Sequence, residues 1–326
     1  MKMSLAGKEG KSRVLILSGA LAIFAFAQLH PLAATPQDAD ASGQSFYADA
    51  KPMLDFPLPD LLKAIPELEG LDPAASQDDL PSILSKTGEV TEDLMGSMPN
   101  LTSREDVTQS KPGGKGKDRE QIQREFDYMI VVHWNGADGT VEEYRSASKG
   151  AGLEVDNRSQ GYMLTSGFAS EWLQFLPPNQ LVSRFRYLGQ QTFGGFKCYV
   201  VAFAQVPGTT SITGTVHFEG RSVLLLYQGI AWIDESTFRI VRFRTDLLAP
   251  HPEITLESQT TELQFGNTTL AETAAPLWLP QGVVVTTQMH DRLYRNVHRY
   301  SDYRVFKVES KILPAPADEP PPTKPN

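Results

Sequence analysis

Short runs of alternating hydrophobic and polar residues, separated by turn-forming residues, fill much of the chain after residue 118. The clearest pair lies between Gln228 and Leu247, where two β-branched and aromatic runs flank the polar residues 234–237. Such runs are typical of strands, and Asp-Glu-Ser-Thr supplies turn residues between them. The pattern therefore predicts a β-hairpin that is one pair in a longer series.

Further runs of this kind occur with no long helix between them. About nine or ten strands are expected, in the runs at residues 126–134, 140–148, 183–191, 196–205, 222–233, 238–247, 255–265, 282–289, 293–300 and 303–308. Their order in the chain predicts sequential antiparallel neighbours. A flat sheet of this size would expose long edges, so the predicted fold class is mainly β: one large curved antiparallel sheet, an open half-barrel.

A helical pattern precedes these strands, between Leu80 and Met98. Its apolar residues recur every three or four positions on one side, Pro81 suits a first turn, and Pro99 ends the run. We expect this helix to cover the concave side of the sheet; a lid that swings on a linker is the alternative. A capping-box match at residues 102–105 predicts another short helix.

The chain is divided by composition into four parts: a signal peptide (1–34), an acidic, partly helical segment with a linker (35–117), the antiparallel β domain (118–312) and a proline-rich tail (313–326). Four basic residues precede an apolar run, Val14 to Ala27, that is too short to span a bilayer comfortably, which is typical of a signal peptide. An uncleaved anchor is the alternative. Residues 35–52 contain little to bury and predict a flexible lead-in, and Lys111 to Lys117 predicts a linker.

The charge of the chain excludes one class of partner, nucleic acid. The formal net charge is −9, and residues 35–110 hold 15 acidic and 4 basic residues. No basic surface for nucleic acid is indicated. After signal cleavage we expect no stable membrane span, and a periplasmic or secreted location. The single cysteine, Cys198, lies in an apolar run and is expected to be buried.

The hairpin also resembles a known family. Residues 229–234, Gly-Ile-Ala-Trp-Ile-Asp, followed by 238–242, Phe-Arg-Ile-Val-Arg, are similar to a strand pair of bacterial periplasmic lipoprotein-sorting proteins, as is Trp-Leu-Pro at 278–280. The resemblance implies an open half-barrel lined with apolar residues and capped by helices, acting as a carrier or sensor of acyl chains. The β region also resembles a group of uncharacterised secreted bacterial proteins.

Residues for chemistry are sparse. There is no His-Glu-x-x-His, no cysteine cluster and no Gly-x-Ser-x-Gly, so we predict no catalytic residue, no metal site and no cofactor. His298 and Asp302 are the nearest histidine–carboxylate pair, but four positions along a strand separate them by about 13 Å. We expect them to be solvated or to pair between strands.

The candidate ligand-binding residues are Trp232, Val241, Phe243, Arg242 and Arg244. We expect the first three to line the concave surface, with Val241 and Phe243 on one face of their strand. The two arginines should share the other face, which is either solvated, with Glu257 or Glu262 as cross-strand partner, or a clamp for an anionic headgroup.

The sequence thus predicts a non-enzymatic binding protein for an acyl-bearing ligand or an apolar partner segment. Its possible partners are a lipid or lipoprotein and a cell-envelope protein. The alternative is an envelope sensor or scaffold in which the protein's own helix fills the concavity.

Overall fold

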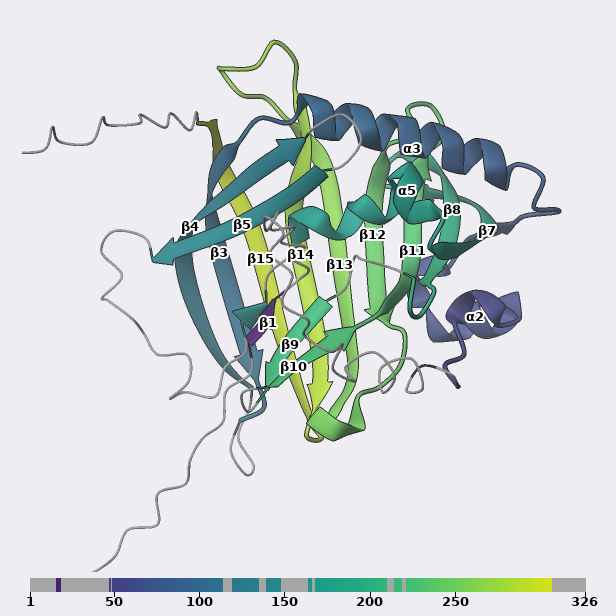
Figure 1. Ribbon diagram of the computed structural model, residues 1–326, viewed down its shortest axis with the longest axis horizontal. Coiled ribbons are helices and arrows are strands. Elements are labelled where there is room, and N and C mark those ends of the chain that lie inside the picture. The colour runs from purple at the N-terminus through teal and green to yellow at the C-terminus, as the bar shows by residue number, and fades with distance from the viewer. Residues whose placement is uncertain are drawn as a thin grey trace, which may run out of the picture.

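The computed structural model describes residues 16–18, 47, 49–113, 119–134, 139–147, 164–165, 168–209, 214–218 and 221–306. These residues form one 11-stranded antiparallel sheet and one four-stranded sheet, with a few short helices. The large sheet is curved and not closed, and α3 lies across one end of it (Figure 1). The predicted fold class is confirmed.

The order of the large sheet is β2-β7-β8-β11-β12-β13-β14-β15-β3-β4-β5. Its strands are β2 (Asp72–Pro73), β3 (Leu101–Lys111), β4 (Glu120–Trp134), β5 (Gly139–Ala147), β7 (Ser183–Phe193), β8 (Phe196–Gln205), β11 (Tyr227–Asp234), β12 (Ile240–Leu247), β13 (Leu256–Thr268), β14 (Leu277–Met289) and β15 (Arg292–Val305). The second sheet has the order β10-β9-β1-β6, with β1 (Ile16–Ser18), β6 (Leu164–Thr165), β9 (Gly214–Phe218) and β10 (Arg221–Leu225).

The helices are short apart from α3 (Leu80–Ser97), which confirms the helix predicted from the apolar spacing. The others are α2 (Leu58–Ala64), α5 (Pro177–Gln180) and the 3₁₀ helices η1 (Met53–Asp55), η2 (Pro66–Leu68), η3 (Phe168–Phe175) and η4 (Pro252–Ile254). Within the described ranges, no helix combines the length and apolarity needed to cross a bilayer.

The predicted hairpin is the β11–β12 pair. Its turn is stabilised by the Asp234 carboxylate, which accepts hydrogen bonds from Ser236 Oγ (2.7 Å) and from the Thr237 backbone N–H (3.1 Å). Arg242 pairs with Trp232, whereas Ile240 pairs with Ile233, so a bulge leaves Val241 as an extra residue. A bulge shifts the side-chain alternation beyond it by one position.

Both faces of the sheet are buried at its centre. Phe203, Ala231 and Phe243, on β8, β11 and β12, belong to one core cluster, whereas the residues on either side of Phe203 and Ala231 belong to another. A strand that is buried on both faces has apolar residues at successive positions, which explains the apolar runs at residues 198–204 and 230–233. We call the face with Phe203 and Phe243 the concave face, since the sheet curves around η3 and α5 on that side (Figure 1), and the face with Trp232 the outer face.

The concave face is filled by helices of the protein itself. Phe175 of η3 is fully buried and makes edge-to-face contacts with Phe203 and Phe243, at centroid distances of 6.2 and 6.0 Å. Ile83 and Met95 of α3 join the same cluster. The expectation that the helix at 80–98 covers the concave side is confirmed, and η3 shares that role.

The outer face is covered by residues 53–69, which comprise η1, α2 and η2 and are called the cover segment below. Its residues Leu61 and Leu68 are at most 1% exposed and pack in the cluster that contains Trp232. Tyr47, within the predicted flexible lead-in, is also buried there; its hydroxyl accepts from the Leu226 N–H at 3.1 Å. The lead-in prediction is therefore wrong at its end.

Residues 101–111 correct two further predictions. The capping-box helix at 102–105 is wrong, because these residues lie in β3, which pairs with both β4 and β15. The sheet therefore begins before residue 118, and the predicted linker at 111–117 joins two neighbouring strands, with Lys111 opposite Glu120. The predicted signal peptide, apart from β1, and the proline-rich tail lie outside the described residues.

Candidate functional site

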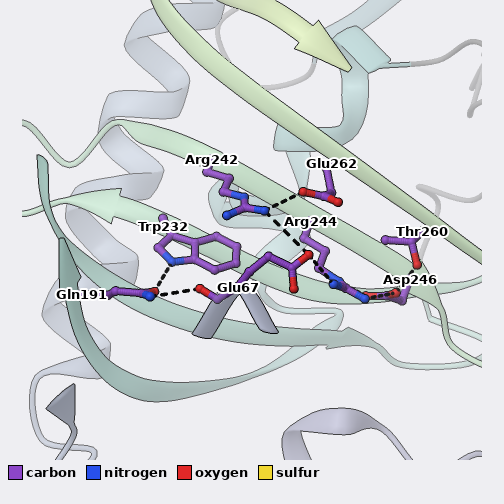
Figure 2. Close-up of polar contacts among 8 residues, drawn as sticks. All are labelled: Glu67, Gln191, Trp232, Arg242, Arg244, Asp246, Thr260 and Glu262. Atoms are coloured by element: carbon purple, nitrogen blue, oxygen red, sulfur yellow. Dashed lines mark hydrogen bonds and ion pairs between the residues drawn. The ribbon is translucent and has the colours of Figure 1, made fainter. Parts of the chain in front are cut away.

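Two of the predicted ligand-binding residues, Trp232 and Arg242, face each other across the β11–β12 pair on the outer face (Figure 2). The Arg242 guanidinium lies over the Trp232 ring, 4.9 Å from its centroid, and the indole N–H donates to Gln191 Oε1 at 2.6 Å. Gln191 in turn donates to the backbone carbonyl of Glu67 at 3.0 Å. Trp232 is fully buried in this arrangement.

Arg242 and Arg244 form ion pairs rather than a solvated face. Arg242 Nη2 pairs with Glu262 Oε2 at 2.5 Å, and Arg244 Nη1 pairs with Glu67 Oε1 at 2.8 Å (Figure 2). Their side chains are only 11% and 13% exposed, because Glu67 of η2 covers both. Asp246 is a second partner of Arg244 at 2.8 Å. The cross-strand role predicted for Glu262 is confirmed, and the expected exposure of this face is wrong.

The five predicted residues do not converge on one surface. The bulge places Val241 in the outer cluster with Trp232, whereas Phe243 lies in the concave cluster under Phe175. The predictions that Val241 and Phe243 share a face, and that Trp232 and Val241 line the concave surface, are therefore wrong. All five side chains are held by packing or ion pairs, and their role in ligand binding stays a prediction.

The arginines of the outer face instead bind the cover segment. Arg184 pairs with Asp55, at 2.5 and 2.9 Å, and Arg186 donates to the carbonyls of Leu54 and Phe56 at 2.9 and 2.6 Å. Together with the Glu67 contacts, these bonds fix both ends of the segment to β7 and β12. The sequence assigned the acidic segment and the arginine-bearing strands to separate parts of the chain. In the structure they pack together and are joined by ion pairs.

An open groove of about 440 Å³ lies at the carboxyl end of α3. Its walls come from α3, from the chain between β13 and β14, and from the end of β15. The lining residues are Leu94, Ser97, Met98, Pro99, Arg239, Glu272, Thr273, Ala274, Ala275, Pro276, Leu277, Trp278 and Val305. Most of this surface is apolar, and its size falls within the range of about 300–1,000 Å³ that small-molecule sites occupy.

A narrow apolar slot adjoins the groove under α3. Leu94, Arg239 and Trp278 line both spaces, and Trp172 of η3 lies in the slot wall. Phe238 also lines the slot and has a φ of 55°, which is unusual for a large aromatic residue. The groove is thus built at the β12 end of the predicted hairpin, beside the residues predicted to bind a ligand and not on them.

A second polar group is buried between β3, β5 and β15. Glu105 and His298 are at most 1% exposed, and His298 Nδ1 lies 2.8 Å from Glu105 Oε1. Arg145 forms a two-pronged ion pair with the same carboxylate, and Thr165 Oγ1 lies 3.1 Å from His298 Nε2. Of the two alternatives expected for His298, pairing between strands is confirmed and solvation is wrong: its partner is a carboxylate on the neighbouring strand β3, 193 residues away.

The protonation of this group follows from its burial and its partners. Burial alone would raise the pKa of Glu105, but hydrogen bonds from His298 and Arg145 outweigh that effect and lower the pKa to about 2. Burial lowers the pKa of His298 from its ordinary value. Since Arg145 already neutralises Glu105, we interpret the group as a structural bridge between strands. In the described ranges, no three His, Cys, Asp or Glu residues gather as metal ligands.

No family model and no curated protein matches this sequence. Solved structures do match. An outer membrane lipoprotein-sorting protein domain from Vibrio parahaemolyticus is 10% identical, covering 70% of this chain and 95% of its own, with a TM-score of 0.36. A DUF1329 family protein from Desulfovibrio piger is 12% identical, covering 72% and 95%, with a TM-score of 0.37.

A LolA superfamily protein from Nitrosomonas europaea also matches, at 10% identity, covering 70% of this chain and 94% of its own, with a TM-score of 0.30. The chain thus has distant structural matches to lipoprotein-sorting domains. The resemblance to lipoprotein-sorting proteins, predicted from residues 229–234, 238–242 and 278–280, is confirmed as a distant structural match. These matches are distant, so the ligand is inferred from the residues that line the groove.

Proposed function

We propose that this protein is a non-catalytic binding protein that holds the acyl chain of a lipid or lipoprotein in the groove at the carboxyl end of α3. The observation behind the proposal is an open, largely apolar groove of about 440 Å³, which shares lining residues with a small apolar slot under α3. Exposed apolar surface in a concave site is stabilised when an apolar ligand covers it, by about 25 cal/mol for each Å² removed from water. From the N-terminal sequence pattern, we place this activity in the periplasm or outside the cell.

A binding titration with a blocking variant tests the proposal. Delipidated protein is titrated with a fluorescent probe that has a single alkyl chain and an uncharged head, and saturable binding is expected. Ala275 lies in the groove wall and is exposed, so Ala275→Trp should fill the space and weaken binding at least about tenfold. Ala271 is exposed in the same loop and does not line the groove, so Ala271→Trp is the matched control.

The titration also decides between this function and a scaffold. Packing of Phe175 against Phe203 and Phe243 favours the alternative, since the protein's own helix fills the centre of the concave face. In that case the groove is only a surface depression and the function lies in contacts with an envelope protein. Absence of saturable binding, or equal binding by both tryptophan variants, would reject the carrier and leave the scaffold.

A further inference from the structure

The groove has one basic side chain, Arg239, at the point where it meets the slot. Its guanidinium lies over the Trp278 ring, 5.6 Å from the centroid, and Arg239 is partly buried. No carboxylate of the described residues lies within ion-pair distance of it. The outer-face arginines differ, since Arg184, Arg242 and Arg244 each have a carboxylate partner.

A second cation lies on the other side of the same hairpin end. Lys86 of α3 lies 4.8 Å from the centroid of the Phe238 ring, and Phe238 lines the slot. Lys86 is exposed, and it too forms no ion pair with a described residue. Two cations therefore lie near the slot, Arg239 in its wall and Lys86 beside the wall residue Phe238, in a chain whose net charge is −9. Glu272 is the acidic residue of the groove wall, and it is exposed.

The size of the groove limits the number of chains. At about 440 Å³ it lies near the lower end of the range of about 300–1,000 Å³ for small-molecule sites. A lipid with two or three acyl chains needs two or three times the apolar volume of a lipid with one. The apolar wall therefore suits one alkyl chain, and the cation beside it suits a negatively charged head.

We propose that the groove binds a single-chain amphiphile with an anionic head, a long-chain carboxylate, whose head pairs with Arg239 while its chain lies along Leu94, Leu277 and Trp278. This inference rests on the proposed function and names its ligand class. An arginine stacked on an aromatic ring has an oriented guanidinium, which can meet a carboxylate with two parallel hydrogen bonds. Lys86, which lines neither space, adds long-range attraction beside the slot.

The test compares ligands that differ in one property at a time: palmitate, hexadecanol and a diacyl phosphatidylglycerol, each below the concentration at which it aggregates. Delipidated protein should bind palmitate at least about tenfold more tightly than hexadecanol, because a charge-assisted hydrogen bond is lost with the alcohol. Myristate, two methylenes shorter than palmitate, should bind about 15-fold more weakly. The diacyl lipid should not compete with palmitate.

The variant Arg239→Ala should weaken palmitate binding about 10- to 100-fold and leave hexadecanol binding unchanged within about threefold. Arg239→Lys keeps the charge and should recover part of the loss. Arg292 is exposed at the start of β15, so Arg292→Ala is the control for a general change in charge. Melting curves of all three variants check that the fold is intact.

The outcomes separate the two proposals. Equal binding of palmitate and hexadecanol, or no effect of Arg239→Ala, would overturn the anionic head while leaving the acyl-binding groove. Tighter binding of the diacyl lipid than of palmitate would overturn the single chain. If none of the three amphiphiles binds, the proposed function itself fails.

Discussion

The attachment of the cover segment to the outer face can be tested at Glu67, because this carboxylate is shared by two arginines. Its Oε1 lies 2.8 Å from Arg244 Nη1 and 3.7 Å from Arg242 Nη2. The isosteric change Glu67→Gln removes the charge and leaves an oxygen that can still accept a hydrogen bond. The substitution therefore isolates the electrostatic part of the contact.

The expected loss of stability follows from exposure. Breaking a fully buried ion pair costs about 3–5 kcal/mol, whereas exposed pairs contribute about 0–1 kcal/mol. Glu67 and the two arginines are 17%, 11% and 13% exposed, but Arg242 keeps Glu262 and Arg244 keeps Asp246. We therefore expect Glu67→Gln to lower the free energy of unfolding by about 2 kcal/mol.

Asp55 offers a matched control in the same segment. Its ion pair with Arg184 has side-chain exposures of 44% and 52%, so Asp55→Asn should cost no more than about 0.5 kcal/mol. Urea unfolding followed by tryptophan fluorescence gives both values, and hydrogen exchange of residues 53–69 shows whether the segment opens locally. Equal urea midpoints for the two variants would refute the reasoning that burial sets the strength of these pairs.

The remaining predictions concern the buried polar group and two buried sites. The pKa of Glu105 is lowered from 4.5 to about 2 and that of His298 is lowered from 6.5, so the stability they contribute is present above about pH 6.5 and is lost as the pH falls. Thermal melts from pH 7 to 3 should show the His298 part of this loss below about pH 6.5 and the Glu105 part below about pH 4.5. Glu105→Gln should remove only the Glu105 part and cost roughly 3 kcal/mol at pH 7. Gly229→Ala should prevent stable folding, because a Cβ there would lie 2.0 Å from a backbone oxygen of β12. Gly282 is the control, since the nearest atom to a Cβ there is at 3.4 Å. In urea melts, Gly282→Ala should change the free energy of unfolding by less than about 1 kcal/mol. Cys198 is fully buried, and burial raises its pKa to about 12. A thiol reagent should therefore label it only after unfolding. Labelling of the native protein at the rate of the unfolded chain would contradict its burial.

The local part of the fold could be predicted because hairpins and helix spacing are encoded by neighbouring residues. The β11–β12 hairpin and α3 are examples. A third is the alternation of residues 230–233 between the two faces of the sheet. The pairing of β15 with β3 could not be predicted, since it joins His298 to Val107 across most of the chain. The run Leu101–Lys111 carries little strand signal, because its buried positions include the polar residues Ser103, Glu105 and Gln109, and a chance capping-box match pointed to a helix instead.

The site was harder to predict because it depends on what covers each face. Periodicity placed Arg242 and Arg244 together correctly, but it could not show that Glu67, about 175 positions earlier, covers them. The bulge at Val241 has no sequence signal that we recognised, and it moves that side chain to the other face. The groove residue Arg239 stands within the motif that carries the resemblance, but nothing in that motif indicates that its side chain lines a groove.

Phe238 links the strain in the hairpin to the groove. A φ of 55° costs a bulky residue on the order of 1–3 kcal/mol and persists only where the surroundings stabilise it. Here the ring stacks on Tyr199 at 6.0 Å and meets Lys86 at 4.8 Å, while the next residue, Arg239, turns toward Trp278. Strained residues cluster at binding sites because the strain fixes side chains in positions that a relaxed strand would not give them. The strain at Phe238 therefore supports the groove end of the hairpin, rather than its centre, as the place where a ligand binds.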